Sequence, residues 1–422
     1  MENRYEKYKD SGIAWIGNIP EHWEVKKLGH LYIPRNEKVS DKDYPALSVT
    51  MQGVLLQLEN VAKTNDGDNR KLVKIGDFAI NSRSDRRGSC GISKYDGSVS
   101  LINIVLTPIN DMNPVYYEWL FHSSLFSDEY YRWGHGIVND LWTTRWQEMK
   151  NIQIAAPPLH EQQLIATYLD QKCGEIDELI TLQEEMITKL QNYKQSVITE
   201  AVTKGLDKNV PLKDSGIEWI GEIPEHWNIC KLKNIFLLST GTTPKDFDQT
   251  SEEDNLINWY TPSDILDSCN DLFSSQRKLS EKVIYANKIS LFPIGTLLYV
   301  GIGASAGKVG YANENGYSNQ QITGLIPLNC YSRFYFYYLS ALKDKIRDNA
   351  FFTTLPIINN AYLGQELIPF PTISEQHSIA DYLDQKCSEI DELISIKQQK
   401  IEKLKDYKKS LIFECVTGKR KV

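Results

Sequence analysis

Residues 9–23 read KDSGIAWIGNIPEHW, and residues 213–227 read KDSGIEWIGEIPEHW, so thirteen of the fifteen positions are identical. Each block is followed by a second repeat, which reads YLDQKCGEIDELI at residues 168–180 and YLDQKCSEIDELI at residues 382–394. The sequence between these blocks has diverged much further. A duplication that keeps its frame and changes its middle parts predicts one scaffold that presents two different domains.

The diverged middle parts still share a pattern of turns. Glycine or proline occurs at five positions of the first copy and again 219 positions later. Because these two residues mark turns, the match predicts the same backbone frame in both copies. The matched residues are Gly76, Gly88, Gly91, Gly97 and Pro108 in the first copy and Gly295, Gly307, Gly310, Gly316 and Pro327 in the second.

Short β-branched and aromatic runs between these turns predict an α+β fold for each middle part. The expected strands lie at residues 71–80, 98–106, 296–300 and 322–326, and the expected short helices at residues 116–121 and 334–342. We expect four segments: a first domain at residues 1–156 with the block 9–23, a first long helix and linker at 157–206, a second domain at 207–370 with the block 213–227, and a second long helix at 371–422.

The second repeat predicts a long helix in each copy. Apolar residues recur at alternating steps of four and three, which is the heptad pattern of a coiled-coil seam. A helix of about 35 to 40 residues is too long to bury such a seam against its own domain. We therefore expect an antiparallel pair that separates two pseudo-symmetric domains, and two separate surface helices are the alternative. The seam residues are Leu169, Ile176, Ile180, Ile187, Leu190, Leu383, Ile390, Ile394, Ile401 and Leu404.

Composition indicates a globular protein. The 422 residues are 41 % apolar and 11 % aromatic, and no run approaches the roughly 18 apolar residues that span a bilayer. Because the N-terminal MENRYEKYKD also lacks an apolar signal region, we expect a cytoplasmic protein with no membrane segment. Seven cysteines without a C-x-x-C pair predict neither a disulfide framework nor a metal site, and Cys173 and Cys387 fall at equivalent apolar helix positions.

The net charge of −8 argues against a nucleic-acid partner for the chain as a whole. Acidic and basic residues are balanced in residues 24–156 and almost balanced in residues 228–370, so the excess of acid lies in the repeated blocks. Phosphate contacts are therefore expected in the middle parts. Tight binding would need a locally basic face or a basic partner subunit.

The two middle parts differ most at one equivalent loop. The first copy has three arginines there, which can bind guanine edges and phosphates; the second has small residues that permit close approach, followed by amides that can read adenine. The alternative is a solvated charged hairpin in the first copy and a tight turn in the second. The candidate DNA-binding residues are Asn81, Ser82, Arg83, Ser84, Arg86, Arg87 and Ser89, and Gly301, Gly303, Ser305, Lys308, Asn319, Gln320 and Gln321.

Three motifs resemble known sites without matching them. The glycine run that begins at Gly301 lacks the helix and acidic residue of a dinucleotide site and the spacing of a phosphate-binding loop. Asn113 opens a near-match to the Asn-Pro-Pro-Tyr loop of amino-methyltransferases, but the second proline is missing, which favours a turn before a helix. His22 and His226 have no other ligand at metal-binding spacing and are expected to pack beside tryptophans.

The doubled DSGIxWIGxIPEHW block, the lead-ins PPLHEQ at residues 157–162 and PTISEQ at residues 371–376, and the YLDQKC-EIDELI helices resemble the DNA-specificity subunit of type I restriction-modification enzymes. The resemblance covers the whole chain. It implies two target-recognition domains, each reading one half of a bipartite, asymmetric site on double-stranded DNA, with the helices setting the gap between the halves.

The resemblance also implies partners. Two methyltransferase subunits would dock on the scaffold and use S-adenosylmethionine, and motor-nuclease subunits would join them to cut DNA. The chain itself is then expected to bind no cofactor and to hold no active site. Two other functions are considered as alternatives, a free-standing DNA adenine methyltransferase and a coiled-coil adaptor that binds no DNA.

Overall fold

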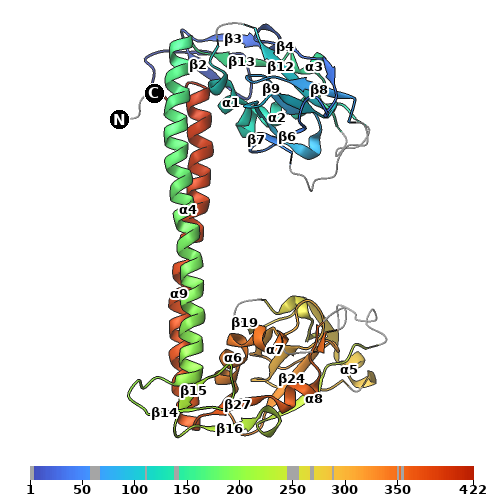
Figure 1. Cartoon of the computed structure of the whole chain (residues 1–422), viewed down its shortest axis with the longest axis vertical. Coiled ribbons are helices and arrows are strands. Elements are labelled where there is room, and N and C mark those ends of the chain that lie inside the picture. The colour runs from blue at the N-terminus through green and yellow to red at the C-terminus, as the bar shows by residue number, and fades with distance from the viewer. Residues whose placement is uncertain are drawn as a thin grey trace. The chain divides into compact units, whose positions relative to one another are not determined.

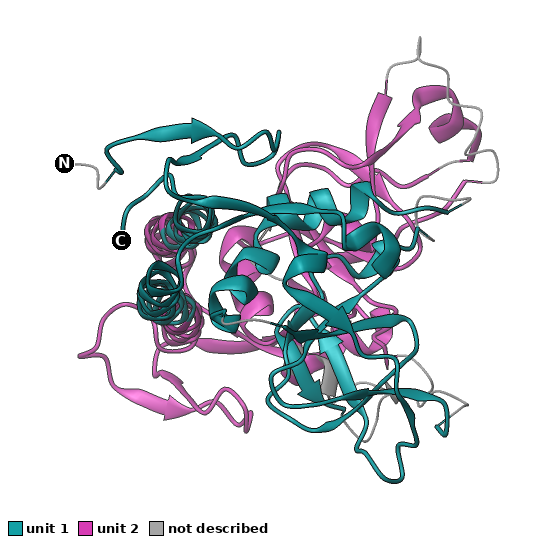
Figure 2. Ribbon diagram, turned by 90° about the horizontal axis from the view of Figure 1, so that it is seen from above, with its two compact units in different colours: residues 1–184, 397–422 teal, residues 185–396 magenta. Residues whose placement is uncertain are grey.

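The computed structural model describes residues 4–57, 67–109, 112–136, 142–244, 256–266, 270–287, 289–348, 351–352 and 356–422. The chain forms two compact units (Figure 2). Unit 1 contains residues 1–184 and 397–422, and unit 2 contains residues 185–396. Each unit therefore combines one α+β domain with a part of each of the two long helices, α4 (Leu159–Lys204) and α9 (Ile373–Val416).

The α+β domain of unit 1 is built on a four-stranded antiparallel sheet with the order β10-β9-β12-β4. Three of its strands, β4, β9 and β12, are labelled in Figure 1. The same domain also contains a three-stranded sheet, β11-β8-β5, and the two-stranded hairpin β6-β7. The strands are β1 Tyr8–Asp10, β2 Asn18–Pro20, β3 Glu24–Lys27, β4 Tyr32–Pro34, β5 Lys38–Val39, β6 Leu47–Thr50, β7 Gly53–Leu56, β8 Arg70–Val73, β9 Phe78–Asn81, β10 Cys90–Ile92, β11 Gly97–Val99, β12 Asn103–Pro108 and β13 Gln153–Ala156. The helices are η1 Leu28–His30, η2 Ser84–Arg86, α1 Pro114–His122, α2 Ser124–Arg132 and α3 Trp146–Met149.

Unit 2 repeats this plan with a five-stranded sheet, β17-β24-β21-β22-β19, and a three-stranded sheet, β20-β18-β23. Its strands are β14 Leu212–Asp214, β15 Glu222–Pro224, β16 Asn228–Lys231, β17 Phe236–Thr240, β18 Leu256–Tyr260, β19 Asn270–Leu272, β20 Arg277–Ser280, β21 Leu297–Val300, β22 Val309–Ala312, β23 Gly316–Ser318, β24 Ile322–Pro327, β25 Phe351–Phe352, β26 Pro356–Ile357 and β27 Leu367–Phe370. Its helices are η4 Leu232–Asn234, η6 Pro262–Asp264, α5 Glu281–Asn287, α6 Ser332–Ala341, α7 Lys343–Asp348 and α8 Asn360–Gln365. The predicted α+β class is confirmed in both units.

Two of the predicted strands are wrong as single elements. The run at residues 71–80 forms β8 and β9, which belong to different sheets, because Gly76 at φ +88° turns the chain between them. The run at residues 98–106 forms β11 and β12, and the turn between them is closed by a hydrogen bond from the Asn103 N–H to the Ser100 carbonyl. A turn inside an apolar run interrupts a strand without interrupting the hydrophobic pattern.

The shared glycine frame corresponds to shared turns. Gly76 and its counterpart Gly295 have φ of +88° and +83°, and Gly88 and its counterpart Gly307 have φ of +74° and +93°. Residues other than glycine rarely adopt this conformation, so these turns explain why glycine stands at the same two places in both copies. The two domains thus share a backbone frame although their side chains differ.

The two long helices pair in an antiparallel coiled coil, as predicted. In unit 1 Lys408 of α9 binds Asp177 of α4, and in unit 2 Lys194 of α4 binds Asp391 of α9. All ten predicted seam residues are buried or half-buried. The helices are 46 and 44 residues long, longer than expected, because each begins within two residues of the strand that precedes it. No helix among the described residues is long and apolar enough to cross a membrane.

The repeated tryptophan block closes each core against the helices. Trp23 and Trp227 are fully buried, each in the large apolar cluster of its own unit. The same clusters contain Cys173 and Cys387, which are buried as expected for small core residues. Burying an aromatic side chain of this size stabilises a fold by about 2–3 kcal/mol. The repeated blocks are therefore the structural frame, and the diverged parts are left to carry the different surfaces.

Candidate nucleic-acid interface

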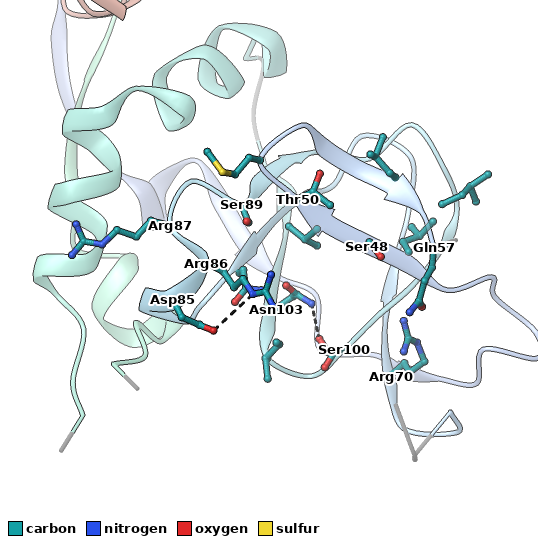
Figure 3. Close-up of a pocket in the computed structure, with 17 residues that line it drawn as sticks. Ser48, Thr50, Gln57, Arg70, Asp85, Arg86, Arg87, Ser89, Ser100 and Asn103 are labelled. Atoms are coloured by element: carbon teal, nitrogen blue, oxygen red, sulfur yellow. Dashed lines mark hydrogen bonds and ion pairs between the residues drawn. The ribbon is translucent and has the colours of Figure 1, made fainter. Parts of the chain in front are cut away.

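Unit 1 contains an open groove with a volume of about 640 Å³ (Figure 3). Its walls are the β6-β7 hairpin, the segment around η2, and the adjoining ends of β9 and β12. The residues that line it are Leu47, Ser48, Val49, Thr50, Met51, Leu55, Leu56, Gln57, Arg70, Asn81, Asp85, Arg86, Arg87, Ser89, Ser100, Ile102 and Asn103. Four of the predicted DNA-binding residues are among them: Asn81, Arg86, Arg87 and Ser89.

The three arginines of the predicted loop have different surroundings. Arg86 lies beside Asn103 in the middle of the groove, 3.8 Å from Asp85, and its side chain is 69 % exposed (Figure 3). Arg87 points away from the hairpin, 3.3 Å from Asp128 and over the ring of Tyr131. Both guanidinium groups remain open to solvent and can bind an anion or a base edge. Arg86 is the better placed of the two for a ligand inside the groove.

The other predicted residues of this loop shape its backbone. The Asn81 side-chain oxygen accepts the Arg83 N–H at 3.1 Å, and the Ser82 hydroxyl donates to the Ile102 carbonyl at 2.5 Å. Arg83 is exposed, but its backbone pairs with Thr143 and its side chain does not line the groove. Ser84 is half-buried in η2 and also lies outside the lining. The structure therefore separates Arg83 from Arg86 although both belong to one short segment.

Several polar groups of the groove come from segments that the sequence did not suggest. Ser48, Thr50 and Gln57 are on or next to the β6-β7 hairpin, and Asn103 opens β12. Arg70 also lines the groove, but it is 4 % exposed and donates to the Ser98 hydroxyl and carbonyl, so it serves the fold. The available signal was the alternating pattern of residues 47–56, which is typical of a hairpin. Nothing in that pattern places the hairpin beside Arg86.

The small-residue loop of unit 2 is covered partly by the chain itself. Gly301 accepts a hydrogen bond from the Ile358 N–H at 2.7 Å, and a side chain at Gly301 would lie 2.7 Å from the Ile358 carbonyl oxygen. The Gly303 N–H donates to the Pro356 carbonyl. At Gly301 a close backbone approach is thus made within the chain by residues 356–358, and DNA binding by this glycine stays a prediction. Ser305 and Lys308 are half-buried in the same loop.

The predicted adenine readers of unit 2 form a small amide cluster next to this loop. Asn319 is buried, its amide donates to the Gln321 side-chain oxygen at 3.0 Å, and it accepts the Gln321 N–H at 3.1 Å. Gln320 is exposed and accepts a hydrogen bond from Thr243. A side chain at Gly303 would lie 3.8 Å from the Gln321 amide nitrogen, so the loop and the amides are brought together. Gln320 is exposed and Gln321 is half-buried, whereas the buried Asn319 supports Gln321 through these two hydrogen bonds.

The lead-in to each long helix anchors the domain to the helix. Glu161 accepts hydrogen bonds from the Trp23 indole at 3.0 Å and the Tyr5 hydroxyl at 2.8 Å, and its carboxylate lies 2.5 Å from His22. The next residue, Gln162, accepts the Asn113 N–H and donates to the Pro157 carbonyl. Asn113 itself caps α1, which confirms the predicted turn before a helix.

Unit 2 repeats the anchor at equivalent positions. Glu375 accepts hydrogen bonds from the Trp227 indole at 3.1 Å and the Thr372 hydroxyl at 2.7 Å, and lies 2.7 Å from His226. Burial opposes ionisation of Glu375, but these hydrogen bonds outweigh it and lower its pKa to about 2. His22 and His226 are about half exposed, and each contacts the carboxylate that also accepts the indole N–H of the neighbouring tryptophan.

A second pair of carboxylates, Asp170 and Asp384, continues the anchor about two and a half turns further along each helix. The Trp119 indole donates to Asp170 at 2.8 Å, and the Tyr337 hydroxyl donates to Asp384 at 2.5 Å. In unit 2 Arg333 adds a second bond to Asp384. Different side chains therefore make the same connection, and the scaffold holds two diverged domains in the same manner.

The family model for the type I restriction modification DNA specificity domain matches residues 20–192 and again residues 224–406. The chain belongs to the type I restriction-modification DNA specificity family. The two matches cover both anchored domains and most of both long helices. The duplication found in the sequence is therefore a duplication of this domain.

Curated relatives are similar over almost the full length of the chain. The type I restriction enzyme MjaVIII specificity subunit of Methanocaldococcus jannaschii is 26 % identical and the match covers 96 % of this chain and 94 % of that protein. The type I restriction enzyme EcoDI specificity subunit of Escherichia coli is 23 % identical, with 87 % and 82 % covered.

Solved structures show the same fold. A chain from a structure described as the basis of complex assembly and conformational transition of the type I R-M system has a TM-score of 0.74 at 16 % identity, over 94 % of this chain and 98 % of that one. The HsdS subunit from Thermoanaerobacter tengcongensis has a TM-score of 0.54 at 18 % identity, over 95 % and 98 %.

Proposed function

We propose that the chain is the DNA sequence-recognition subunit of a type I restriction-modification complex, and that each α+β domain reads one half of a bipartite site. The observation that carries this proposal is one duplicated anchor that holds two surfaces of different chemistry. In unit 1 the exposed guanidinium of Arg86 lies in a groove beside Asn103. In unit 2 the corresponding region presents the neutral amides of Gln320 and Gln321.

The difference between the two surfaces accounts for an asymmetric site. Arginine binds two acceptors of guanine in the major groove, and glutamine binds the donor and acceptor of adenine. Because the two surfaces offer different groups, the two half-sites have different sequences. The chain as a whole is acidic, so the phosphate contacts that give most of the affinity come largely from the partner subunits and from the exposed arginines of unit 1.

The helix pair offers two equivalent docking surfaces for one kind of partner. In unit 1 Leu179, Leu182 and Tyr407 are between 43 and 52 % exposed on the coiled coil. In unit 2 the equivalent residues, 214 positions away in the duplication, are Leu393, Ile396 and Tyr193, between 48 and 57 % exposed. Exposed apolar residues on a regular helix are typical of an interaction surface. Two equal surfaces fit two copies of a methyltransferase subunit.

Catalysis belongs to the partners in this proposal. The methyltransferase subunits bind S-adenosylmethionine and transfer the methyl group, motor-nuclease subunits cut, and this chain binds no cofactor. In both anchors the histidine and the tryptophan contact the same carboxylate. We therefore assign these side chains a structural role and not a catalytic one.

The experiment is co-expression of the chain with a type I methyltransferase subunit, followed by mapping of methylated adenines in genomic DNA. We expect methylation at one bipartite, asymmetric site, and none when either chain is expressed alone. Methylation by this chain alone would instead support a free-standing methyltransferase. A stable complex that shows no sequence preference on DNA would support an adaptor.

A further inference from the structure

The groove of unit 1 has an apolar wall, and hydrogen bonds to DNA do not explain why apolar side chains are exposed there. Four of its lining residues expose large apolar side chains: Met51 is 72 % exposed, Leu56 52 %, Leu55 39 % and Ile102 37 %. Three of the four belong to the β6-β7 hairpin or its turn. Removing such side chains from water on binding is favourable. Their clustering in one groove therefore indicates a ligand with an apolar part.

The hairpin is held firmly enough to place these side chains. Leu47 and Val54 are buried in a cluster with Val73, Val99 and Val105. Its turn is closed by a hydrogen bond from the Thr50 hydroxyl to the Gly53 carbonyl at 3.0 Å, with Gly53 at φ +104°. A side chain at Gly91 of β10 would lie 2.7 Å from the Cα of Gly53, so the hairpin sits directly against that strand.

Hydrogen-bonding groups share the groove with the apolar wall. Arg86, Asn103, Ser89 and Gln57 line it together with the hairpin. On the base edges that face the major groove, the apolar group is the 5-methyl of thymine, and the other groups are hydrogen-bond donors and acceptors. A surface that combines an arginine and amides with exposed aliphatic side chains therefore matches a guanine next to an A·T pair.

We propose that the β6-β7 hairpin of unit 1 recognises thymine, with the exposed side chains of Met51 in its turn and Leu56 at its open end placed to contact 5-methyl groups. The inference rests on the proposed function and deepens it, because it names a base in the half-site that unit 1 reads.

The test uses the complex with its methyltransferase subunit and duplexes in which 2′-deoxyuridine replaces one thymidine at a time. Uracil keeps the base pair and removes only the methyl group. The half-site of unit 1 is identified first, as the half whose recognition changes in Arg86→Ala. We expect about three- to fivefold weaker binding at one or more uracils in that half, which is the effect of losing one buried methyl group.

Variants connect this loss to the hairpin. Met51→Ser with Leu56→Ser should bind the thymine and uracil duplexes equally, while preference in the other half-site is unchanged. Ile75→Ser is the matched control, because Ile75 is 68 % exposed in unit 1 and does not line the groove. It should keep the discrimination. Thermal unfolding of each complex confirms that the variants are folded.

The possible failures are distinguishable. Equal binding of thymine and uracil duplexes by the unmodified complex, absence of thymine from that half-site, or retained discrimination in the double variant would each overturn the inference and leave the proposed function intact. Loss of affinity in the double variant without any effect of uracil would assign the hairpin to wedging between base pairs. Absence of any sequence-specific binding would overturn the proposed function itself.

Discussion

Lys408 of α9 places its ammonium 2.7 Å from both carboxylate oxygens of Asp177 on α4. In unit 2 Lys194 of α4 makes the same contact with Asp391 of α9, at 2.8 and 2.7 Å. The members of the two pairs are related by the 214-residue offset of the duplication. Each helix thus provides a lysine in one unit and an aspartate in the other, which requires that the partners run antiparallel.

Reversing one of these pairs tests the antiparallel pairing. Lys194 is only 11 % exposed, so Asp391→Lys places a second positive charge beside a nearly buried one and should lower the free energy of unfolding by about 1–2 kcal/mol. Adding Lys194→Asp should recover most of this loss. Urea unfolding of the unmodified chain, the two single variants and the double variant measures these changes in the free energy of unfolding. Glu392→Lys, on the exposed side of α9, is the control. Independent losses in the two single variants would contradict the contact.

Charges in the seam should separate the helices. Ile180→Asp in unit 1 and Ile394→Asp in unit 2 each place an unpaired carboxylate among apolar side chains of the coiled coil, at a cost of about 3 kcal/mol. We expect the complex with the methyltransferase subunit to fail to form in size-exclusion chromatography. Glu178→Asp, at an exposed position of α4, should assemble normally. Normal assembly of the Ile180→Asp, Ile394→Asp double variant would mean that these residues do not belong to the seam.

The helices should also set the gap between the half-sites. Inserting one heptad after Glu184 and another after Ile396 keeps the seam in phase and lengthens each helix by about 10 Å, or roughly three base pairs. Methylation mapping should show the same two half-sites with a longer gap. Seven residues inserted at Lys208, in the loop after α4, should leave the gap as it is. An unchanged gap in the heptad variant would assign the spacing to another part of the complex.

The arginines of unit 1 should divide between reading bases and holding phosphate. Arg86→Ala should reduce discrimination in one half-site by about 1–3 kcal/mol, because Arg86 lies inside the groove. Arg83→Ala, outside it, should weaken binding to all duplexes alike and flatten the salt dependence. Titrations at two salt concentrations against duplexes altered in each half separate these effects. Gln320→Ala is the control variant for the half-site that unit 2 reads. If Arg86→Ala weakens binding equally whichever half-site is altered, Arg86 contacts phosphate and not a base.

Acid should weaken the anchor of unit 2 in a defined range. The pKa of Glu375 falls from an ordinary value of 4.5 to about 2 on folding, so its stabilisation is complete above pH 4.5 and is lost as the pH falls towards 2. Glu375→Gln should therefore be less stable than the unmodified chain at pH 6, and the difference should shrink between pH 4.5 and 2. Urea unfolding across that range measures it. A constant difference would show that Glu375 acts only through packing.

The sequence by itself determined the elements whose signal is local and periodic. The heptad spacing that starts at Leu169 and at Leu383 predicts which side of each long helix is buried, because residues three and four positions apart lie on the same face of a helix. The matched glycines predicted the turns at Gly76 and Gly295, since a positive φ restricts the residue at that point whatever surrounds it. The near-identical blocks predicted the duplicated frame that anchors both domains.

The tertiary structure alone decided which residues form the groove. Arg83 and Arg86 are three positions apart, yet one lies outside the groove and the other inside, because η2 turns the chain between them. Thr50 and Asn103 line one groove only because the β6-β7 hairpin packs against the sheet that contains β12. Gly301 contacts Ile358, which comes from a distant segment of the chain. These positions depend on long-range contacts between segments of unrelated pattern, and no local periodicity in the sequence records such contacts.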